Sequence, residues 1–255
     1  MEAKELKNNW EELLSYITKY ISEPRQKSLL EFYNKFEDRM IMYPASHKKE
    51  YHNAFPGGYV DHVLNVLKGA EKTYDIWAEM GANLEGFTVE ELIFSALNHD
   101  LGKLGDENEP SMIPQDDQWR KKNLGEDYKF NKEIPFASVP DRSLFLLQSN
   151  GIIYSFNEMI AIQTHDGLYD EGNFKYLKTY LPETKPRNCL PYILHQADMM
   201  AARIEFERHF LNKGFGKPIE KKSYINNVSK TTQSDHNKAL SKSKNPKLQN
   251  LINNL

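Results

Sequence analysis

The chain has a single cysteine, Cys189, among its 255 residues. One thiol cannot form an internal disulfide, and it cannot build a cysteine-based zinc finger or an iron–sulfur cluster, because both need several thiolates. A shortage of cysteine is typical of proteins from a reducing compartment. Any metal ion that this chain binds must therefore be held by histidine and carboxylate side chains.

Long hydrophobic runs are also missing. No apolar stretch approaches the roughly 20 residues that cross a bilayer, and the first residues lack the basic and apolar segments of a secretory leader. We therefore expect a cytoplasmic protein without a membrane contact. Hydrophobic residues make up 39% of the chain and aromatic residues 12%, which is enough to predict a folded domain with a core.

Charges are unevenly distributed along the chain. The formal net charge is −3, yet the segment 211–255 holds nine lysines against only Glu220 and Asp235. Ser, Asn and Gln dominate the same segment and apolar residues are sparse, which predicts a flexible basic C-terminal tail. Such a tail could contact nucleic acid or a protein partner, and a solvated linker is the alternative.

Apolar residues at steps of three and four predict a mostly helical chain. The pattern indicates two N-terminal helices, over 6–21 and 24–40, and two later ones, over 59–80 and 190–210. We divide the chain into an N-terminal helical segment that packs on the core (1–44), a central domain (45–210) and the tail (211–255).

Two capping boxes predict further helix starts. Thr88 and Glu91 precede a short apolar helix that ends at His99, and Ser155 and Glu158 precede another that ends at His165. Between these two helices, residues 105–136 are polar and irregular. They predict an inserted loop with a short strand within 128–134.

Four histidines and two aspartates occupy related places on these predicted helices. His62 lies inside an apolar stripe, the pair His99-Asp100 and His165 each end a helix, and His195 and Asp198 share one helix face. A divalent first-row metal requires imidazole and carboxylate ligands that converge from several rigid elements. Helices that present these groups inward would supply them, as helical bundles do in their metal sites.

The order of these groups resembles the HD phosphohydrolase superfamily. The matching stretches are Phe55–His62 (FPGGYVDH), Asn98–Lys103 (NHDLGK), Gln163–Gly167 (QTHDG) and Ile193–Asp198 (ILHQAD). The Gly-Gly before the first histidine and the closing His-x-x-Asp are most similar to HD-domain 3′–5′ exoribonucleases and relaxase-associated HD domains. The resemblance covers roughly residues 45–205 and implies an all-α, HD-domain helical bundle with a metal centre.

The resemblance also implies a set of metal ligands, namely His62, His99, Asp100, His165, His195 and Asp198. Asp100 would bridge two ions, with His165 and His195 on the second. Mn²⁺ or Fe ions are expected first, and Mg²⁺, Ni²⁺ or Zn²⁺ are alternatives, because mixed histidine and carboxylate ligation discriminates poorly among them. One or two ions would lower the pKa of a bound water, which attacks phosphorus in a phosphoester.

Other residues near these motifs are candidates for catalysis and substrate binding. Lys103, beside the catalytic Asp100, could hold a phosphate oxygen, or it could simply interact with the end of its helix. The loop before the first ligand helix offers His52, Lys48 and Lys49 for phosphate contacts. Asp166 stands where the exoribonuclease-like members have the second histidine of His-His-Gly, and we count it as substrate-binding.

Three functions remain open from the sequence. The first is a metal-dependent phosphohydrolase or phosphodiesterase that cleaves nucleotides or nucleic acid ends. The second is a 3′–5′ exonuclease on single-stranded RNA or DNA, although the chain lacks the N-terminal OB-fold of the exoribonuclease-like members. The third is a non-catalytic module that binds nucleotides or nucleic acid. The intact His99-Asp100 pair favours an enzyme.

Overall fold

The computed structural model describes residues 1–49 and 51–212. That part of the chain is mostly helical, with ten α-helices and one two-stranded sheet. The prediction of a mostly helical chain is therefore confirmed. Within the described residues no helix is long and apolar enough to span a membrane. The predicted basic tail lies outside the described residues except for its first two positions.

Three helices form the N-terminal segment: α1 (Ala3–Tyr20), α2 (Arg25–Lys35) and α3 (Glu37–Met42). The helix predicted over 24–40 is divided at Phe36, whose backbone leaves helical geometry at φ −104° and ψ 10°. The Phe36 ring packs against Phe32, with ring centroids 4.9 Å apart. The new direction of α3 allows Arg39 to donate a hydrogen bond to the carbonyl of Asp106 at 2.5 Å.

Helix α4 (Gly58–Glu79) begins at the Pro-Gly-Gly breaker. Gly57 has φ +90°, a conformation that favours glycine. A Cβ on Gly58 would lie 2.0 Å from the carbonyl oxygen of Asn53, so only glycine allows the loop to approach this closely. The two glycines therefore fix how loop 43–57 enters α4, four residues before His62.

Both predicted capping boxes are present. The Glu91 N–H donates to Thr88 Oγ1 at 3.1 Å and the Thr88 N–H donates to Glu91 Oε2 at 2.8 Å, at the start of α5 (Val89–Asn98). Ser155 and Glu158 make the same pair of bonds at the start of α8 (Phe156–Thr164). Because each box fixes where its helix begins, it also fixes the position of the histidine at the far end.

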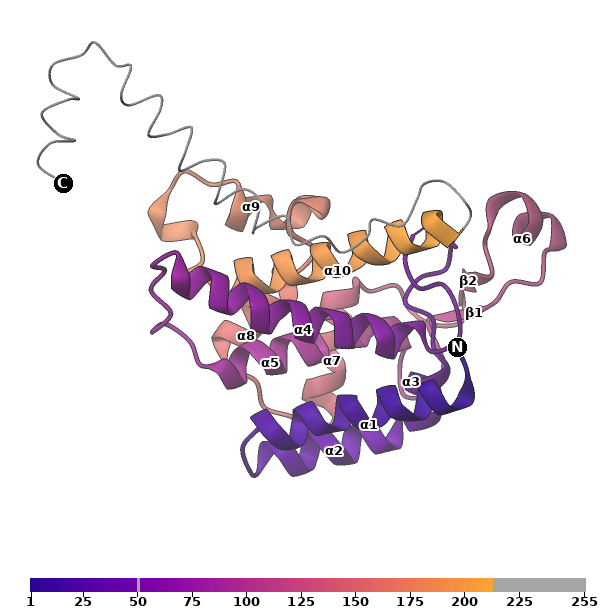
Figure 1. Cartoon of the computed structure of the whole chain (residues 1–255), viewed down its shortest axis with the longest axis horizontal. Coiled ribbons are helices and arrows are strands. Elements are labelled where there is room, and N and C mark those ends of the chain that lie inside the picture. The colour runs from indigo at the N-terminus through magenta and orange to yellow at the C-terminus, as the bar shows by residue number, and fades with distance from the viewer. Residues whose placement is uncertain (50, 213–255) are drawn as a thin grey trace, which may run out of the picture. The chain divides into compact units, whose positions relative to one another are not determined.

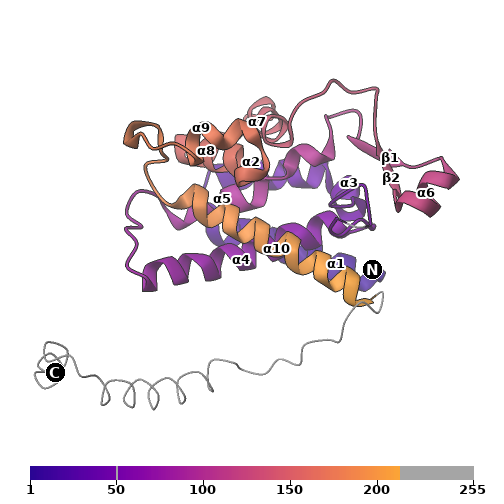
Figure 2. The ribbon, with the colours of Figure 1, turned by 90° about the horizontal axis from the view of Figure 1, so that it is seen from above.

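The last helix, α10 (Leu190–Asn212), packs against α4, α8 and α5. Figure 2 shows α10 lying across α4 and α5. On the opposite side, α1 and α2 lie beneath α4 and α5 in Figure 1. The buried apolar residues of the N-terminal helices join those of α4, α5 and α10 in one core. The N-terminal segment is thus part of the core packing around the central helices.

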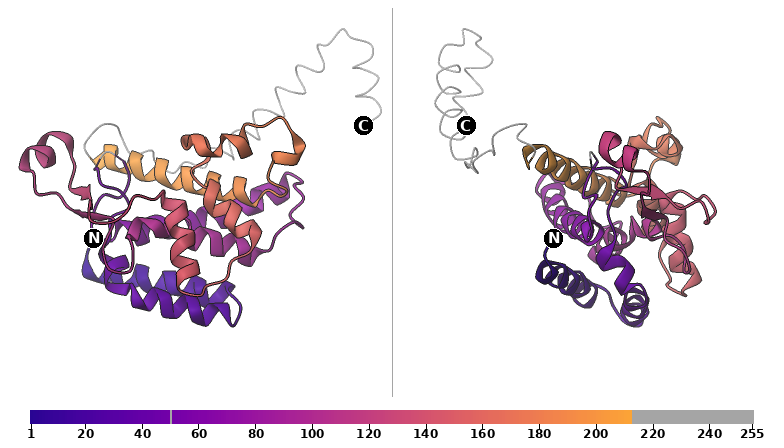
Figure 3. Two further views of the ribbon diagram at one scale, coloured as in Figure 1. Left: turned by 180° about the vertical axis from the view of Figure 1, so that it is seen from behind. Right: turned by 90° about the vertical axis from the view of Figure 1, so that its right-hand side faces the viewer.

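The insertion between α5 and α8 has more structure than the sequence indicated. It contains β1 (Met112–Pro114), α6 (Gln118–Leu124) and β2 (Tyr128–Phe130), and the strands pair antiparallel with Met112 opposite Phe130. The predicted strand is therefore present but ends at Phe130. The hairpin and α6 project from one end of the helices (Figures 1 and 3).

Several short elements complete the described part. A 3₁₀ turn, η1 (Leu101–Leu104), continues from α5, and α7 (Val139–Ser149), which was not predicted, packs on it. After α8 the chain forms η2 (Gly167–Tyr169), η3 (Glu171–Asn173), α9 (Phe174–Leu177) and η4 (Pro182–Thr184) before it enters α10.

A buried ion pair joins the N-terminal helices to the central ones. Arg25 donates to both carboxylate oxygens of Glu158, at 2.7 and 2.9 Å, and to Glu90 at 2.5 Å. The Glu158 side chain is fully buried, and this burial raises its pKa although Arg25 opposes the shift. The guanidinium therefore compensates a carboxylate that has no access to water.

We predict that Arg25→Met destabilises the fold by about 3–5 kcal/mol, because it leaves Glu158 buried without a charged partner. Lys27→Met is the matched control, since the Lys27 side chain is 74% exposed and lies 4.0 Å from the exposed carboxylate of Glu31. Its effect should stay within about 0.5 kcal/mol. Urea unfolding followed by circular dichroism measures both, and equal stability of the two variants would contradict the prediction.

Candidate metal centre

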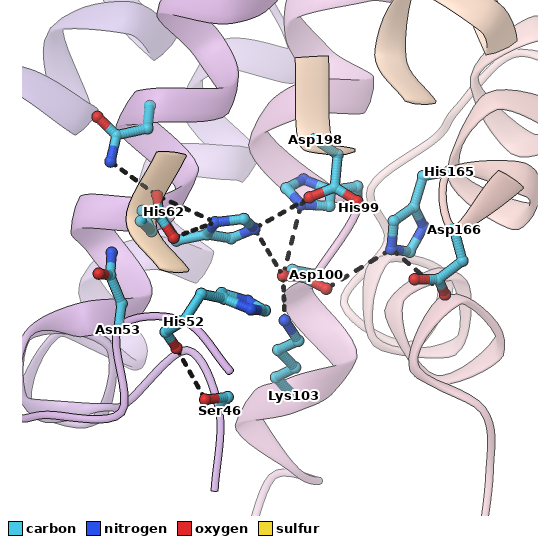
Figure 4. Close-up of polar contacts among 12 residues, drawn as sticks. Ser46, His52, Asn53, His62, His99, Asp100, Lys103, His165, Asp166 and Asp198 are labelled. Carbon is cyan, nitrogen blue, oxygen red and sulfur yellow. Dashed lines mark hydrogen bonds and ion pairs between the residues drawn. The ribbon is translucent and has the colours of Figure 1, made fainter. Parts of the chain in front are cut away.

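Four helices bring five of the predicted ligands together in the core. His62 comes from the first turns of α4, His99 and Asp100 from the end of α5, His165 from the end of α8, and Asp198 from α10 (Figure 4). Asp198 has slight exposure, and the other four are buried. Residues far apart in the sequence thus meet at one point between the packed helices.

Asp100 lies at the centre of this cluster. Its Oδ2 is 3.3 Å from His62 Nε2 and 3.5 Å from His99 Nε2. Its other oxygen, Oδ1, is 3.6 Å from His165 Nε2. Asp198 Oδ1 approaches the same two nitrogens as Asp100 Oδ2, at 3.2 Å from His62 and 3.8 Å from His99. The two Asp100 oxygens therefore face different imidazoles.

The second ring nitrogen of each imidazole fixes its protonation. His99 Nδ1 is 2.8 Å from the carbonyl of Ala96, and His165 Nδ1 is 2.7 Å from that of Ile162. Since a carbonyl only accepts, each Nδ1 must carry a proton, and in the neutral ring each Nε2 then presents a lone pair to the cluster. This is the tautomer that metal-ligating histidines adopt.

Two of these nitrogens form no hydrogen bond of normal geometry. The Nε2 atoms of His62 and His99 are buried, and among the described residues their nearest polar neighbours are the Asp100 and Asp198 oxygens at 3.2–3.8 Å. A buried polar atom without a partner costs about 1–3 kcal/mol, so such atoms are rare unless they have another use. Groups of three ligand atoms lie within 4.8 Å of one another here, including His62, His99 and Asp100. The donor set fits a divalent cation.

The electrostatics of the cluster are strongly coupled. Burial opposes ionisation of Asp100, but the charges of Lys103 and His99 outweigh it and hold the Asp100 pKa well below its usual range. Burial likewise opposes protonation of His165, but the charge of Asp166 and the Asp100 contact raise the His165 pKa to about 9. Cations are therefore favoured at this position, whether protons or metal ions.

Glu205 contacts the cluster, and it was not predicted from the sequence. It is buried on α10, and one of its oxygens lies 3.1 Å from His62 Nδ1. Asn65 also donates to Glu205, at 2.8 Å. A carboxylate that accepts from a ligand histidine fixes the ring and raises its basicity. The sequence does contain a sign of this contact, because Glu205 follows Asp198 by two helical turns and therefore lies on the same face of the helix.

His195 occupies a different place from the other five. Its Nδ1 donates to the carbonyl of His165 at 2.8 Å, and its ring fills the space beside Gly167, where a Cβ would lie 2.1 Å from it. Gly167 has φ +58°, so glycine suits this position for two reasons. His195 lines the cavity next to the cluster but belongs to none of the close ligand groups among the described residues.

The three residues expected to bind substrate surround the cluster. Lys103 Nζ is 2.5 Å from Asp100 Oδ2, and Asp166 Oδ2 is 3.7 Å from His165 Nε2. The His52 ring lies 4.7 Å from that of His62, and burial lowers the His52 pKa to about 2, so the ring is neutral. All three line a cavity of about 1080 Å³ that reaches the cluster.

Lys48 and Lys49 are directed elsewhere. Lys48 Nζ is 3.3 Å from Glu126, and Lys49 Nζ is 3.0 Å from Asp127. Both carboxylates belong to the turn before β2, so these lysines hold loop 43–57 against the insertion. Lys48 and Lys49 thus have a role in joining these two segments, and a phosphate contact of either stays a prediction.

Comparison with known proteins gave no relatives. No protein-family model matches the chain, and neither a curated protein nor a solved structure matches it. What the chain does must therefore be inferred from its own geometry.

We predict that Glu205→Ala weakens Mn²⁺ binding by about 10- to 100-fold, because His62 loses the carboxylate that orients its ring. Glu207→Ala is the matched control on the same helix, since Glu207 is exposed and pairs with Arg203 at 3.1 Å. Isothermal titration calorimetry with the full chain gives both dissociation constants. Equal constants for the two variants would show that Glu205 has no part in a metal site.

Proposed function

We propose that the chain is a metal-dependent phosphohydrolase of the HD type, which cleaves phosphoester bonds in nucleotides or at nucleic acid ends. The observation that carries the proposal is the convergence of His62, His99, Asp100 and Asp198, in which the buried Nε2 atoms of both histidines face carboxylate oxygens without forming a hydrogen bond. The order of these groups along the chain, which resembles the HD superfamily, supports it.

The proposed ligand assignment follows the positions of the side chains. His62, His99, Asp100 and Asp198 would hold one cation, since their ligand atoms face one point. Asp100 Oδ1 faces His165, which supports a bridging carboxylate and a second cation. The nitrogen and oxygen donors suit Mn²⁺ or Fe, with Mg²⁺, Ni²⁺ or Zn²⁺ as alternatives. Such cations activate water and neutralise phosphoryl oxygens.

The chain's own residues would bind and orient the substrate. Lys103 presents a partly exposed ammonium group at the edge of the cluster, paired with Asp100, and can attract a phosphate oxygen as a point charge. His52 is neutral, so it can donate or accept one hydrogen bond without bringing a charge. Asp166 is partly exposed in the cavity wall and can accept a hydrogen bond from a sugar hydroxyl.

We predict that Asp100→Asn and His99→Ala each lower phosphate release by at least about a hundredfold. Each change removes a proposed metal ligand itself, whereas Glu205→Ala removes only a residue that orients one. The assay offers Mn²⁺ with a panel of nucleotides, cyclic dinucleotides and short single-stranded RNA and DNA. Asp38→Asn, on the exposed surface of α3, is the control and should keep full activity. Stepwise release of mononucleotides from the strands would identify the exonuclease alternative.

Two results would reject the proposal. One is background activity of the wild-type chain on every substrate with each of the five metals. The other is equal activity of the wild type and Asp100→Asn at saturating Mn²⁺. A chain that binds nucleotides in the first case would instead be a non-catalytic binding module.

A second prediction concerns the number of ions. We expect about two Mn²⁺ per wild-type chain by equilibrium dialysis and elemental analysis, and about one in His165→Ala, as a bridged pair requires. Retention of both ions in His195→Ala would limit His195 to the cavity wall, where the structure places it. One ion per wild-type chain would contradict the bridged centre.

A further inference from the structure

A second cavity adjoins the one that reaches the cluster. It has a volume of about 650 Å³, within the range of small-molecule sites. Tyr51, His52 and Lys103 line both cavities and form the wall that they share. A ligand with its phosphate at Lys103 can therefore place its other end in the second cavity.

Segments distant in the sequence build this second cavity, and several bonds hold them together. Loop 43–57 is joined to the insertion by hydrogen bonds from the Lys49 N–H to the Gly125 carbonyl at 3.0 Å and from the Tyr128 N–H to the His47 carbonyl at 3.3 Å. On the opposite side, the Gly102 N–H donates to Ser143 Oγ of α7 at 2.8 Å. The walls are therefore fixed by the backbone of three segments.

Aromatic rings line this cavity without being packed in the core. Phe130 is 64% exposed, Phe136 is 98% exposed, and Tyr51 is also exposed. The His47 ring lies between two of them, with its centroid 5.0 Å from that of Phe130 and 5.3 Å from that of Tyr51. Exposed π-faces around a cavity are suited to a planar ring, because stacking occurs on either face.

The charged residues of this cavity are all cationic. Lys103, Lys132 and Arg142 line it, and no carboxylate does. Within the described part of the chain, neither Lys132 nor Arg142 forms a close ion pair with an acidic side chain, and Arg142 donates to the Pro135 carbonyl at 2.5 Å. A cavity with aromatic walls and positive charge fits a ligand that is both planar and anionic.

We propose that this second cavity, which we call the aromatic pocket, binds the nucleobase of a nucleotide whose phosphate lies at Lys103 and the ligand cluster. A sugar phosphate without a base would make no stacking contact with Phe130 or Phe136, and an aliphatic ester has no planar ring that could stack on them. The inference rests on the proposed function for the position of the phosphate. The base belongs to a free nucleotide or to the end of a single strand, which present the same chemistry.

The test measures binding without turnover. Isothermal titration calorimetry of the full chain with Mn²⁺ compares non-cleavable 5′-methylenephosphonates of adenosine, guanosine, cytidine and uridine with the base-free ribose analogue. We expect at least one nucleoside analogue to bind about tenfold or more tightly than the base-free one, since stacking of one base contributes about 1–3 kcal/mol.

Single substitutions then locate the base. Phe130→Ala and Phe136→Ala should each remove most of that advantage while leaving the affinity for the base-free analogue unchanged. Phe145→Ala is the matched control, because Phe145 is 62% exposed on α7 but does not line the pocket. A single-stranded oligonucleotide with phosphorothioate linkages, added as a competitor, shows whether the pocket also accepts a strand end.

The inference is overturned if the base-free analogue binds as tightly as all four nucleoside analogues, or if both pocket variants keep the difference. These outcomes are separable from failure of the proposed function. Hydrolysis of base-free and nucleoside esters at equal rates would retain the phosphohydrolase and reject the pocket. Base-dependent binding without any phosphate release would retain the pocket and reject the phosphohydrolase.

Discussion

The Asp100 carboxylate lies where α4, α8 and α10 all pack against the end of α5. It is buried, so its charge requires partners, and three imidazoles and Lys103 surround it. The three imidazoles come from α4 and from the ends of α5 and α8, whose positions core packing fixes. The central helices therefore have to serve two conditions at once, a close-packed apolar core and a charged centre within it. This double requirement explains why Glu205, which contacts His62 from the side away from Asp100, is buried as well.

The sequence predicted the helices that carry His99 and His165 well, because a capping box marks the start of each. A capping box is read from four neighbouring residues, and those at Thr88 and Ser155 led directly to the positions of His99 and His165. The break at Phe36 and the pairing of β1 with β2 depend on contacts between distant segments, which a local pattern does not contain. Glu205 was missed because a buried glutamate resembles a surface one until its partner is known.

The insertion illustrates how a polar, irregular segment acquires a defined role. Its residues resemble a surface loop, yet ion pairs from Lys48 and Lys49 hold it against the loop that carries His52. Lys48 or Lys49 was a candidate for a phosphate contact, and in the structure both form ion pairs with carboxylates of the insertion. The positive charge of a lysine predicts that it has an anionic partner, but it does not identify that partner.

Both α5 and α8 end at the cluster, with His99 and His165 as their C-terminal caps. The peptide dipoles of a helix sum to a partial negative charge at that end, which favours a nearby cation by about 0.3–1 kcal/mol. Two such ends at one cluster add a contribution from the backbone to the attraction that Asp100 and Asp198 exert on a cation. The main chain and the side chains of the cluster therefore favour the same sign of charge.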